Sequence, residues 1–295
     1  MNSIKILAFG NSYSVDALTY LTKILASAGY DDVVIGHICD GGCNINQHWS
    51  NVDDTMESFH PAHPDVIAMD GTAGCSISKN GVSTSTEGAT LKERYINTIS
   101  AVEWDFVTIQ HGPNHVEKVE TYSYLPRLLA FIKEHLISEK TRIIYHSVWK
   151  YNDNIAEANS TAFQYGTIID IAKNTVMINP EFVGIIPAAT FRQNLMSSYL
   201  TDKDIARDYG HMGLTLGRYA LGLLWYCVLT GGSVDDVTYV PTPDEVSEET
   251  KATFREKWGH VHLDITESDM LVVKEAIENA LKSPYEITGS RYRDA

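Results

Sequence analysis

Five short apolar runs, separated by stretches with helical spacing, most limit how this chain folds. The runs are residues 4–9, 33–38, 106–110, 142–147 and 182–187, and the helical stretches are 15–28, 91–102, 124–136 and 158–173. Strands that alternate with helices indicate parallel βαβ units. The runs are apolar nearly throughout, which is typical of strands covered on both faces. The sequence therefore predicts an α/β fold, a three-layer αβα sandwich around a mainly parallel, five-stranded sheet.

Two segments extend this plan. Residues 64–90 contain short β-prone pieces separated by Gly and Asn, a pattern that predicts a hairpin inserted before the helix expected at 91–102. Residues 243–283 are charged and have helical spacing, which predicts a helical C-terminal extension. Because no composition break, internal repeat or low-complexity tract divides the chain, we expect a single domain over residues 1–295.

The charge balance limits the possible partners. Asp and Glu number 38 against 23 Lys and Arg, for a formal net charge of -15. Each contact to a phosphate needs a basic side chain nearby, so nucleic acid and anionic membrane surfaces are not expected partners. No window reaches the roughly 18 apolar residues that span a bilayer. We expect a cytoplasmic protein if Met1 is the native start, and a periplasmic or secreted one if a signal peptide has been removed.

The four cysteines do not indicate a metal site. Cys39 and Cys43 lie close together in the sequence, but His37 and His48 do not complete a zinc-ligand spacing. No metal and no other cofactor is therefore expected. Reduced, buried thiols are predicted, and a disulfide between Cys43 and Cys75 is the alternative for an exported protein.

Polar residues follow the predicted strands at the places where ligands bind in open parallel sheets. Gly10-Asn11-Ser12 follows the first strand, and the second and third lead into loops with Gly41-Gly42 and Gln110 to Asn114. Asp208 and His211 stand three residues apart ahead of the apolar helix expected at 214–229. Acyl transfer by a serine needs a base, a carboxylate that orients the base, and donors for the oxyanion. Ser12 is the serine, His211 the base and Asp208 the carboxylate, and a backbone amide of Gly41 or Gly42 with the Asn114 side chain supplies the donors.

In this order and spacing, the set resembles the SGNH hydrolases, also called GDSL-type esterases, over residues 4–229. Their four sequence blocks hold a Ser, a Gly, an Asn, and a His with an Asp three residues before it. The sequence is most similar to a subgroup long filed as a domain of unknown function, which opens with GNSY or GNSF; Gln110 at the end of the third strand and Trp149 after the fourth also match. The resemblance implies flavodoxin-like strand order and a metal-independent hydrolase.

The resemblance also implies roles for individual residues. Ser12 is the nucleophile and gives its own amide to the oxyanion hole, and Asp208 and His211 are orienter and base. Gly42, or Gly41 beside it, is the second donor. Asn114 is the third, with Gln110 as the alternative because the block reads Gly-Pro-Asn-His where Gly-x-Asn-Asp is usual. Asn11 replaces the aspartate of the commoner Gly-Asp-Ser form.

The expected function is hydrolysis of small acyl esters, acetyl esters first, on a carbohydrate. Trp149, Tyr151 and His111 are the candidate substrate-binding residues: the first two because aromatic side chains stack on sugar rings, and His111 because it belongs to a predicted site loop. Core packing is the rival explanation for Trp149. Two alternatives use the same fold: an acyltransferase with the same residues, and a non-catalytic carbohydrate-binding protein. Ser14, two residues deeper than Ser12, is expected to cap the first helix.

Overall fold

The structure is a computed structural model that describes residues 2–56, 74–151, 161–208, 210–258 and 261–293. The chain divides into two compact units. The first, called the sheet unit, comprises Met1–Val15, Gly29–Val148 and Asp170–Ile185. The second, called the helical unit, comprises Asp16–Ala28, Trp149–Ile169 and Ile186–Ala295. The prediction of a single domain stays a prediction.

The sheet has seven strands, where the sequence predicted five. They are β1 (Asn2–Gly10), β2 (Tyr30–Cys39), β3 (Cys75–Lys79), β4 (Val82–Ser85), β5 (Phe106–Gln110), β6 (Arg142–His146) and β7 (Phe182–Ile186). Their order is β4-β3-β2-β1-β5-β6-β7. The five predicted strands thus lie in the flavodoxin-like order that the resemblance implied. The pairs β1/β2, β1/β5 and β5/β6 are parallel.

The two additional strands come from the predicted hairpin. Strand β3 pairs antiparallel with β2 and with β4, so the hairpin extends the sheet at its edge. Asn80 and Gly81 form the turn with φ of 48° and 86°, the left-handed geometry that Asn-Gly adopts in tight hairpins. The sequence prediction counted this hairpin as an insertion because its β-prone pieces are short and separated by Gly and Asn. The part of the predicted insertion before residue 74 lies outside the described residues.

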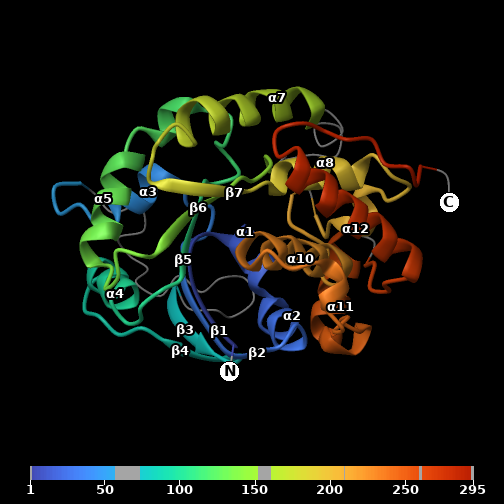
Figure 1. Cartoon of the computed structure of the whole chain (residues 1–295), viewed down its shortest axis with the longest axis horizontal. Coiled ribbons are helices and arrows are strands. Elements are labelled where there is room, and N and C mark those ends of the chain that lie inside the picture. The colour runs from blue at the N-terminus through green and yellow to red at the C-terminus, as the bar shows by residue number, and fades with distance from the viewer. Residues whose placement is uncertain (1, 57–73, 152–160, 209, 259–260, 294–295) are drawn as a thin grey trace. The chain divides into compact units, whose positions relative to one another are not determined.

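Helices α3 (Ile45–Ser50), α4 (Leu91–Ile99) and α5 (Leu125–His135) gather on one side of this sheet (Figure 1). Their apolar faces join the strands in one core, in which Leu7, Val107 and Leu128 are fully buried. Thr90 and Glu93 form a capping box that fixes the start of α4. The predicted three-layer αβα arrangement depends on how the two units are placed together, so it stays a prediction.

The helical unit is built around α10 (Leu216–Thr230), which is buried along nearly its whole length. Helices α2 (Leu21–Ser27), α9 (Asp202–Ile205) and α12 (Glu267–Lys282) contact it, and α8 (Ala188–Met196) packs on α12. Helix α7 (Thr161–Ile171) and helix α11 (Glu248–Trp258) complete the unit. Because α10 is apolar all round, it needs neighbours on every side.

Two of the predicted helical stretches are interrupted in the structure. The stretch expected as one helix over 15–28 is two, α1 (Ser12–Leu18) and α2. Helix α1 begins earlier than predicted because the Asn11 side chain accepts the Tyr13 amide and caps it. The helix predicted to end at Lys173 is α-helical to Ile171 and continues as a π-helix over Ala172–Val176. Predicted residues 158–160 lie outside the described residues.

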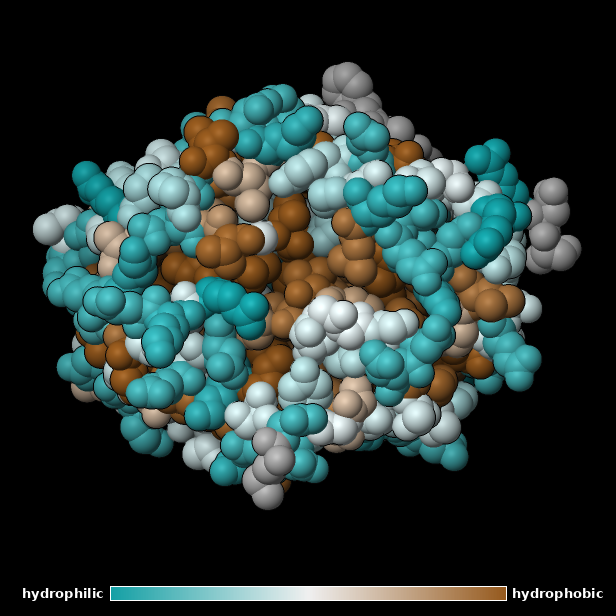
Figure 2. All heavy atoms as spheres, in the orientation of Figure 1, coloured by the Kyte–Doolittle hydropathy of each residue, from teal (hydrophilic) through white to brown (hydrophobic). Residues whose placement is uncertain are grey.

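Hydrophilic side chains predominate around the margin of the face shown in Figure 2, in keeping with the acidic composition. Within the described part of the chain, no helix combines the length and the apolar character that a membrane span requires.

Gly36 tests the packing of the sheet unit. A Cβ there would lie 2.7 Å from the Trp104 ring and 2.9 Å from Leu7 Cδ1, so we expect Gly36→Ala to lower the free energy of unfolding by about 1–3 kcal/mol through overpacking. Gly166→Ala in α7 is the control, because a Cβ there meets nothing within 4 Å, and it should raise stability by about 0.5–1 kcal/mol. Urea unfolding measures both. Equal effects of the two substitutions would contradict this account of the packing.

Candidate active site

The β1–α1 turn is held by the side chain of Asn11, which has no exposed surface. Its Nδ2 donates to the Cys43 carbonyl at 3.0 Å and to the His111 carbonyl at 3.4 Å. Its Oδ1 accepts the Tyr13 amide at 3.0 Å and Gln110 Nε2 at 2.6 Å. One side chain therefore links the loops that follow β1, β2 and β5. An aspartate at this position has no N–H groups to donate to the two carbonyls, which explains why this chain has Asn11 in place of the commoner aspartate.

Ser12 opens α1 directly after this turn and is partly exposed. Ser14 is not the helix cap that the sequence predicted, because Asn11 caps the helix instead. Ser14 Oγ donates to the Asn11 carbonyl at 2.7 Å and lies 2.8 Å from His37 Nε2. Since the hydroxyl hydrogen is used on the carbonyl, Ser14 accepts from His37. The two serines thus differ in environment, with Ser14 buried and Ser12 partly exposed.

The proposed oxyanion donors Gly42 and Asn114 lie near each other. A Cβ added to Gly42 would sit 3.8 Å from Asn114 Nδ2, and Gly42 has a φ of 71°, a conformation that favours glycine. Gly112 makes the approach possible, because a Cβ there would come within 2.7 Å of the Gly42 carbonyl. The Asn114 side chain is exposed. For Gly41, the alternative, a Cβ would meet nothing within 4 Å.

Gln110, the alternative to Asn114, is committed to other partners. It is 1% exposed, its Nε2 donates to Asn11, and its Oε1 accepts from His146 Nδ1 at 2.9 Å. Burial lowers the pKa of His146 to about 3, so the imidazole is neutral. Gln110 connects β5 to β6 and steadies Asn11. The side chain of Gln110 is therefore engaged in these contacts, which favours Asn114 as the side-chain donor of the proposed oxyanion hole.

His111, expected to contact substrate, has no exposed surface. Its ring stacks on Tyr122 with centroids 4.0 Å apart, and its Nε2 lies 2.9 Å from Thr121 Oγ1. Burial lowers its pKa to about 4. A side chain enclosed in this way packs the loop rather than meeting a ligand. The sequence could not reveal this, because the partners Thr121 and Tyr122 lie in a short 3-10 helix, Val119–Tyr122, that has too few residues to show a periodicity.

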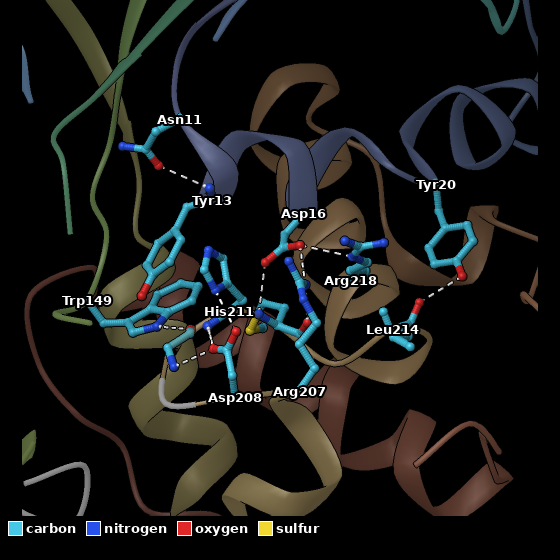
Figure 3. A network of polar contacts seen from close by, with 12 residues as sticks. Asn11, Tyr13, Asp16, Tyr20, Trp149, Arg207, Asp208, His211, Leu214 and Arg218 are labelled. Carbon is cyan, nitrogen blue, oxygen red and sulfur yellow. Dashed lines mark hydrogen bonds and ion pairs between the residues drawn. The ribbon is translucent and has the colours of Figure 1, made fainter. Parts of the chain in front are cut away.

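In the helical unit, Asp208 and His211 form a hydrogen-bonded pair (Figure 3). His211 Nδ1 donates to Asp208 Oδ2 at 2.8 Å, and Asp208 Oδ1 accepts the backbone amides of Gly210 at 2.9 Å and His211 at 2.7 Å. Because Nδ1 carries the hydrogen, the lone pair of the neutral ring is at Nε2. Burial raises the pKa of Asp208, but hydrogen bonds and charge from His211 and the backbone amides outweigh it, so the net pKa is lowered. This pair can act as base and orienter.

Trp149 and Tyr151 both contact the His211 segment. The Trp149 indole N–H donates to the Gly210 carbonyl at 2.7 Å, and the side chain is 3% exposed. The Tyr151 ring meets the His211 ring edge to face, with centroids 5.5 Å apart. Trp149 thus fixes the backbone beside the histidine, and Tyr151 limits the movement of the ring.

A second carboxylate, missed by the sequence analysis, holds the same segment (Figure 3). Asp16, fully buried, accepts from Arg207 Nη1 at 2.5 Å, Arg218 Nε at 2.9 Å and the Met212 amide at 2.9 Å. Arg207 also donates to the Met212 carbonyl at 2.6 Å, and its amide donates to the His211 carbonyl at 3.1 Å. A charged residue within the apolar stretch of α1 was the one available signal for this cluster. Its partners lie 191 or more residues away in the sequence.

The cysteines carry no disulfide, since all four are free and buried. The alternative pairing of Cys43 with Cys75 is therefore wrong for this structure. Burial first, and then the charge of Asp40, raise the pKa of the Cys43 thiol well above its usual range. Over the ranges that the structure describes, no three His, Cys, Asp or Glu side chains are grouped as metal ligands.

These features define an α/β protein with a seven-stranded, mostly parallel sheet and a buried Asp-His pair. The chain belongs to the family described as Domain of unknown function (DUF4886), whose model matches residues 5–257. This confirms the predicted relation to a subgroup of unknown function.

Two solved structures are similar to this chain, and the first shows the same fold. A DUF4886 family protein from Bacteroides uniformis ATCC 8492 is similar over 99% of this chain and 100% of its own, with a TM-score of 0.75 and 24% identity. A chain from Slackia heliotrinireducens, described as "a putative SGNH hydrolase", matches 76% of this chain and 97% of its own, with a TM-score of 0.43 and 15% identity. No curated protein matches the sequence.

The Asp16 cluster leads to a stability prediction. Asp16→Ala leaves Arg207 and Arg218 without their buried partner, and we expect the free energy of unfolding to fall by about 3–5 kcal/mol. Asp32→Ala is the control: Asp32 pairs with the exposed Lys79 at 3.4 Å, and its loss should change stability by less than about 1 kcal/mol. Urea unfolding compares the two. A loss for Asp16→Ala as small as the control would contradict a structural role for the cluster.

The same cluster predicts a pH dependence. Burial raises the pKa of Asp16, but the charges of Arg207, Arg218 and His211 lower it more, to a net value below the usual 3.8. A depressed pKa in the folded state contributes stability above pH 3.8, and this contribution is lost as the pH falls below that value. We therefore expect the stability difference between wild type and Asp16→Asn to narrow below pH 3.8, measured by thermal unfolding across pH. A difference that widens at low pH would contradict this.

Proposed function

We propose that this protein is a serine esterase in which Ser12 is the nucleophile, His211 the base and Asp208 its orienter. The observation that carries the proposal is the Asp208–His211 pair, with an Nδ1–Oδ2 distance of 2.8 Å. Two backbone amides fix the carboxylate, so the ring is held in the tautomer that leaves Nε2 as proton acceptor. A structural histidine does not need a buried carboxylate held in this way.

The first half of the reaction forms an acyl-enzyme. His211 Nε2 takes the Ser12 hydroxyl proton while Oγ bonds to the ester carbonyl carbon, and Asp208 stabilises the imidazolium. The oxyanion accepts from the amides of Ser12 and Gly42 and from the Asn114 side chain. The carbon–oxygen bond to the alcohol then breaks, and His211 returns the proton to the leaving oxygen.

The second half releases the acid. Water loses a proton to His211 as its oxygen bonds to the acyl carbon, and the Ser12–acyl bond breaks with the proton passing back to Ser12 Oγ. No other reactant is needed, because each proton taken by His211 is returned within the same half-reaction.

Helix α1 supports the proposal that Ser12 and His211 act together. Ser12 and Asp16 are four residues apart in one helix and so share a face. Asp16 accepts the amide of Met212, the residue after His211. Helix α1 therefore carries both the proposed nucleophile and the carboxylate that binds the backbone next to His211.

The proposed substrates are small acyl esters, acetyl esters first, on a carbohydrate. Tyr151 beside His211 gives an aromatic surface of the kind on which sugar rings stack. Trp149, a candidate from the sequence, is mostly buried and contributes by holding Gly210.

The nucleophile is tested with p-nitrophenyl acetate. We expect wild type to release p-nitrophenol and Ser12→Ala to lose at least about 1,000-fold in kcat/KM, because no other group forms the acyl-enzyme. Ser100→Ala, an exposed serine at the end of α4, is the matched control and should keep wild-type activity. Equal activity of Ser12→Ala and wild type would remove Ser12 as the nucleophile.

The orienting carboxylate is tested separately. In Asp208→Asn the amide can donate to Nδ1 and favour the wrong tautomer, so we expect kcat to fall about 1,000- to 10,000-fold with KM changed little. Steady-state kinetics on p-nitrophenyl acetate give both constants. An unchanged kcat would show that Asp208 serves structure alone.

A further inference from the structure

Helix α12 of the helical unit (Figure 1) has a buried side and an exposed side. The helix packs on α8 and α10, and its buried apolar residues are Val272, Val273, Ala276, Ile277 and Ala280. On the other side, Leu271 is 50% exposed and Leu281 is 42% exposed. Single exposed leucines are common on protein surfaces, so the pattern between these two matters more than either alone.

The residues between the two leucines have a regular spacing. Leu271, Lys274, Glu278 and Leu281 follow one another at intervals of three, four and three residues. Side chains at these intervals line up along one side of a helix, as they do where two helices pack in a coiled coil. Lys274 is partly exposed and Glu278 is exposed. We call these four residues the α12 stripe; it has a leucine at each end and opposite charges between them.

The α12 stripe is complementary to itself when two copies run antiparallel. Residues 271 and 281 are equally far from position 276, and so are residues 274 and 278. About a two-fold axis at that position, Leu271 faces Leu281 of the second copy, and Lys274 faces Glu278 of the second copy. In a parallel arrangement each charged residue would face its own copy, and such like-charge contacts are unfavourable.

Contacts within one chain leave this pairing open. Lys274 forms an ion pair with Asp235, whose side chain is 68% exposed. Exposed pairs of this kind contribute little to stability, so Lys274 can turn to another carboxylate at small cost. Glu275 also lies near the proposed axis, where it would approach its own copy. Its side chain is 12% exposed and accepts from Arg291 Nε at 3.1 Å, so its charge is balanced within its own chain.

We propose that the α12 stripe is the contact surface for a second copy of this chain, in a two-fold symmetric dimer with antiparallel α12 helices. The leucines supply apolar contact at both ends, and the two pairs of Lys274 with Glu278 fix the direction and register. All these residues belong to the helical unit, and the inference is independent of the proposed function. The stripe is only about three helical turns long, too short to bury the roughly 800 Å² per partner of a standard interface, so we expect a weak dimer with a Kd of about 10–100 µM.

Charge exchange tests the pairing in the full-length protein. Lys274→Glu places two acidic groups opposite each other, and Glu278→Lys places two basic groups opposite each other. We expect each variant alone to raise the dimer Kd at least about 10-fold, measured by sedimentation equilibrium. An equimolar mixture of the two variants restores both opposite-charge pairs and should form a heterodimer with wild-type affinity. Glu278→Lys is the more informative variant, because it also reduces the net charge of -15 that keeps two chains apart.

The apolar ends are tested by Leu271→Glu and Leu281→Glu. Each should weaken the dimer at least about 10-fold, because a carboxylate then faces a leucine away from water. Ile137→Glu is the matched control: Ile137 is 52% exposed but lies after α5 in the sheet unit, so this variant should keep the wild-type Kd. All the substituted side chains are exposed or partly exposed, and thermal unfolding at the wild-type temperature shows that each variant is folded.

Weakening by each charge variant, with recovery in their mixture, supports the antiparallel pairing. A wild type that is still monomeric at about 200 µM, above the expected Kd range, overturns the inference. A dimer that both leucine variants leave intact overturns it as well, because its interface then lies elsewhere. Tighter association of Glu278→Lys than of wild type also overturns it, since net charge rather than the Lys274–Glu278 pair then governs association.

Discussion

The hydrogen bonds of Asn11 are the constraint on which the turn that carries Ser12 depends. One buried amide donates to the Cys43 and His111 carbonyls and accepts from Tyr13 and Gln110. The ends of three neighbouring strands are thereby held at fixed distances, and α1 starts at Ser12 rather than further along. This explains how a partly exposed serine can be held firmly only two residues after a strand ends. It also explains why Gln110, next to Asn11, is not available for substrate chemistry.

Two carboxylates hold different parts of the histidine segment, one the ring of His211 and the other the backbone beside it. Asp208 bonds to the ring of His211 and fixes its tautomer, whereas Asp16 bonds to the backbone at Met212 and to Arg207 and Arg218. Burial opposes the charge on both, and each keeps a lowered pKa because hydrogen bonds and nearby positive charge outweigh burial. A mobile loop could not keep a general base oriented. Burying two charged groups is the cost of making this segment rigid.

The sequence predicted the strands well because a strand buried on both faces needs an unbroken apolar run. Strand β5 matches its prediction at both ends, and DUF4886 membership confirms the subgroup. Helix starts were less predictable because a cap such as Asn11 depends on contacts made after folding. The edge hairpin was predicted but not counted in the sheet, since both of its strands are short and β4 is exposed. Apart from the Asp208–His211 pair, the buried polar contacts were not predicted: His111 needs Tyr122, and Asp16 needs Arg207, distant in the sequence.

The most direct test of the central claim is covalent labelling with an alkyl fluorophosphonate, followed by mass spectrometry of the peptides. An activated serine displaces fluoride and keeps the phosphonyl group, whatever the natural ester is. The account predicts that the label is found on Ser12, that Ser12→Ala takes none, and that Asp208→Asn reacts far more slowly. A folded wild-type protein that takes no label, or carries it on another residue such as Ser14, would contradict the claim that Ser12 is the nucleophile.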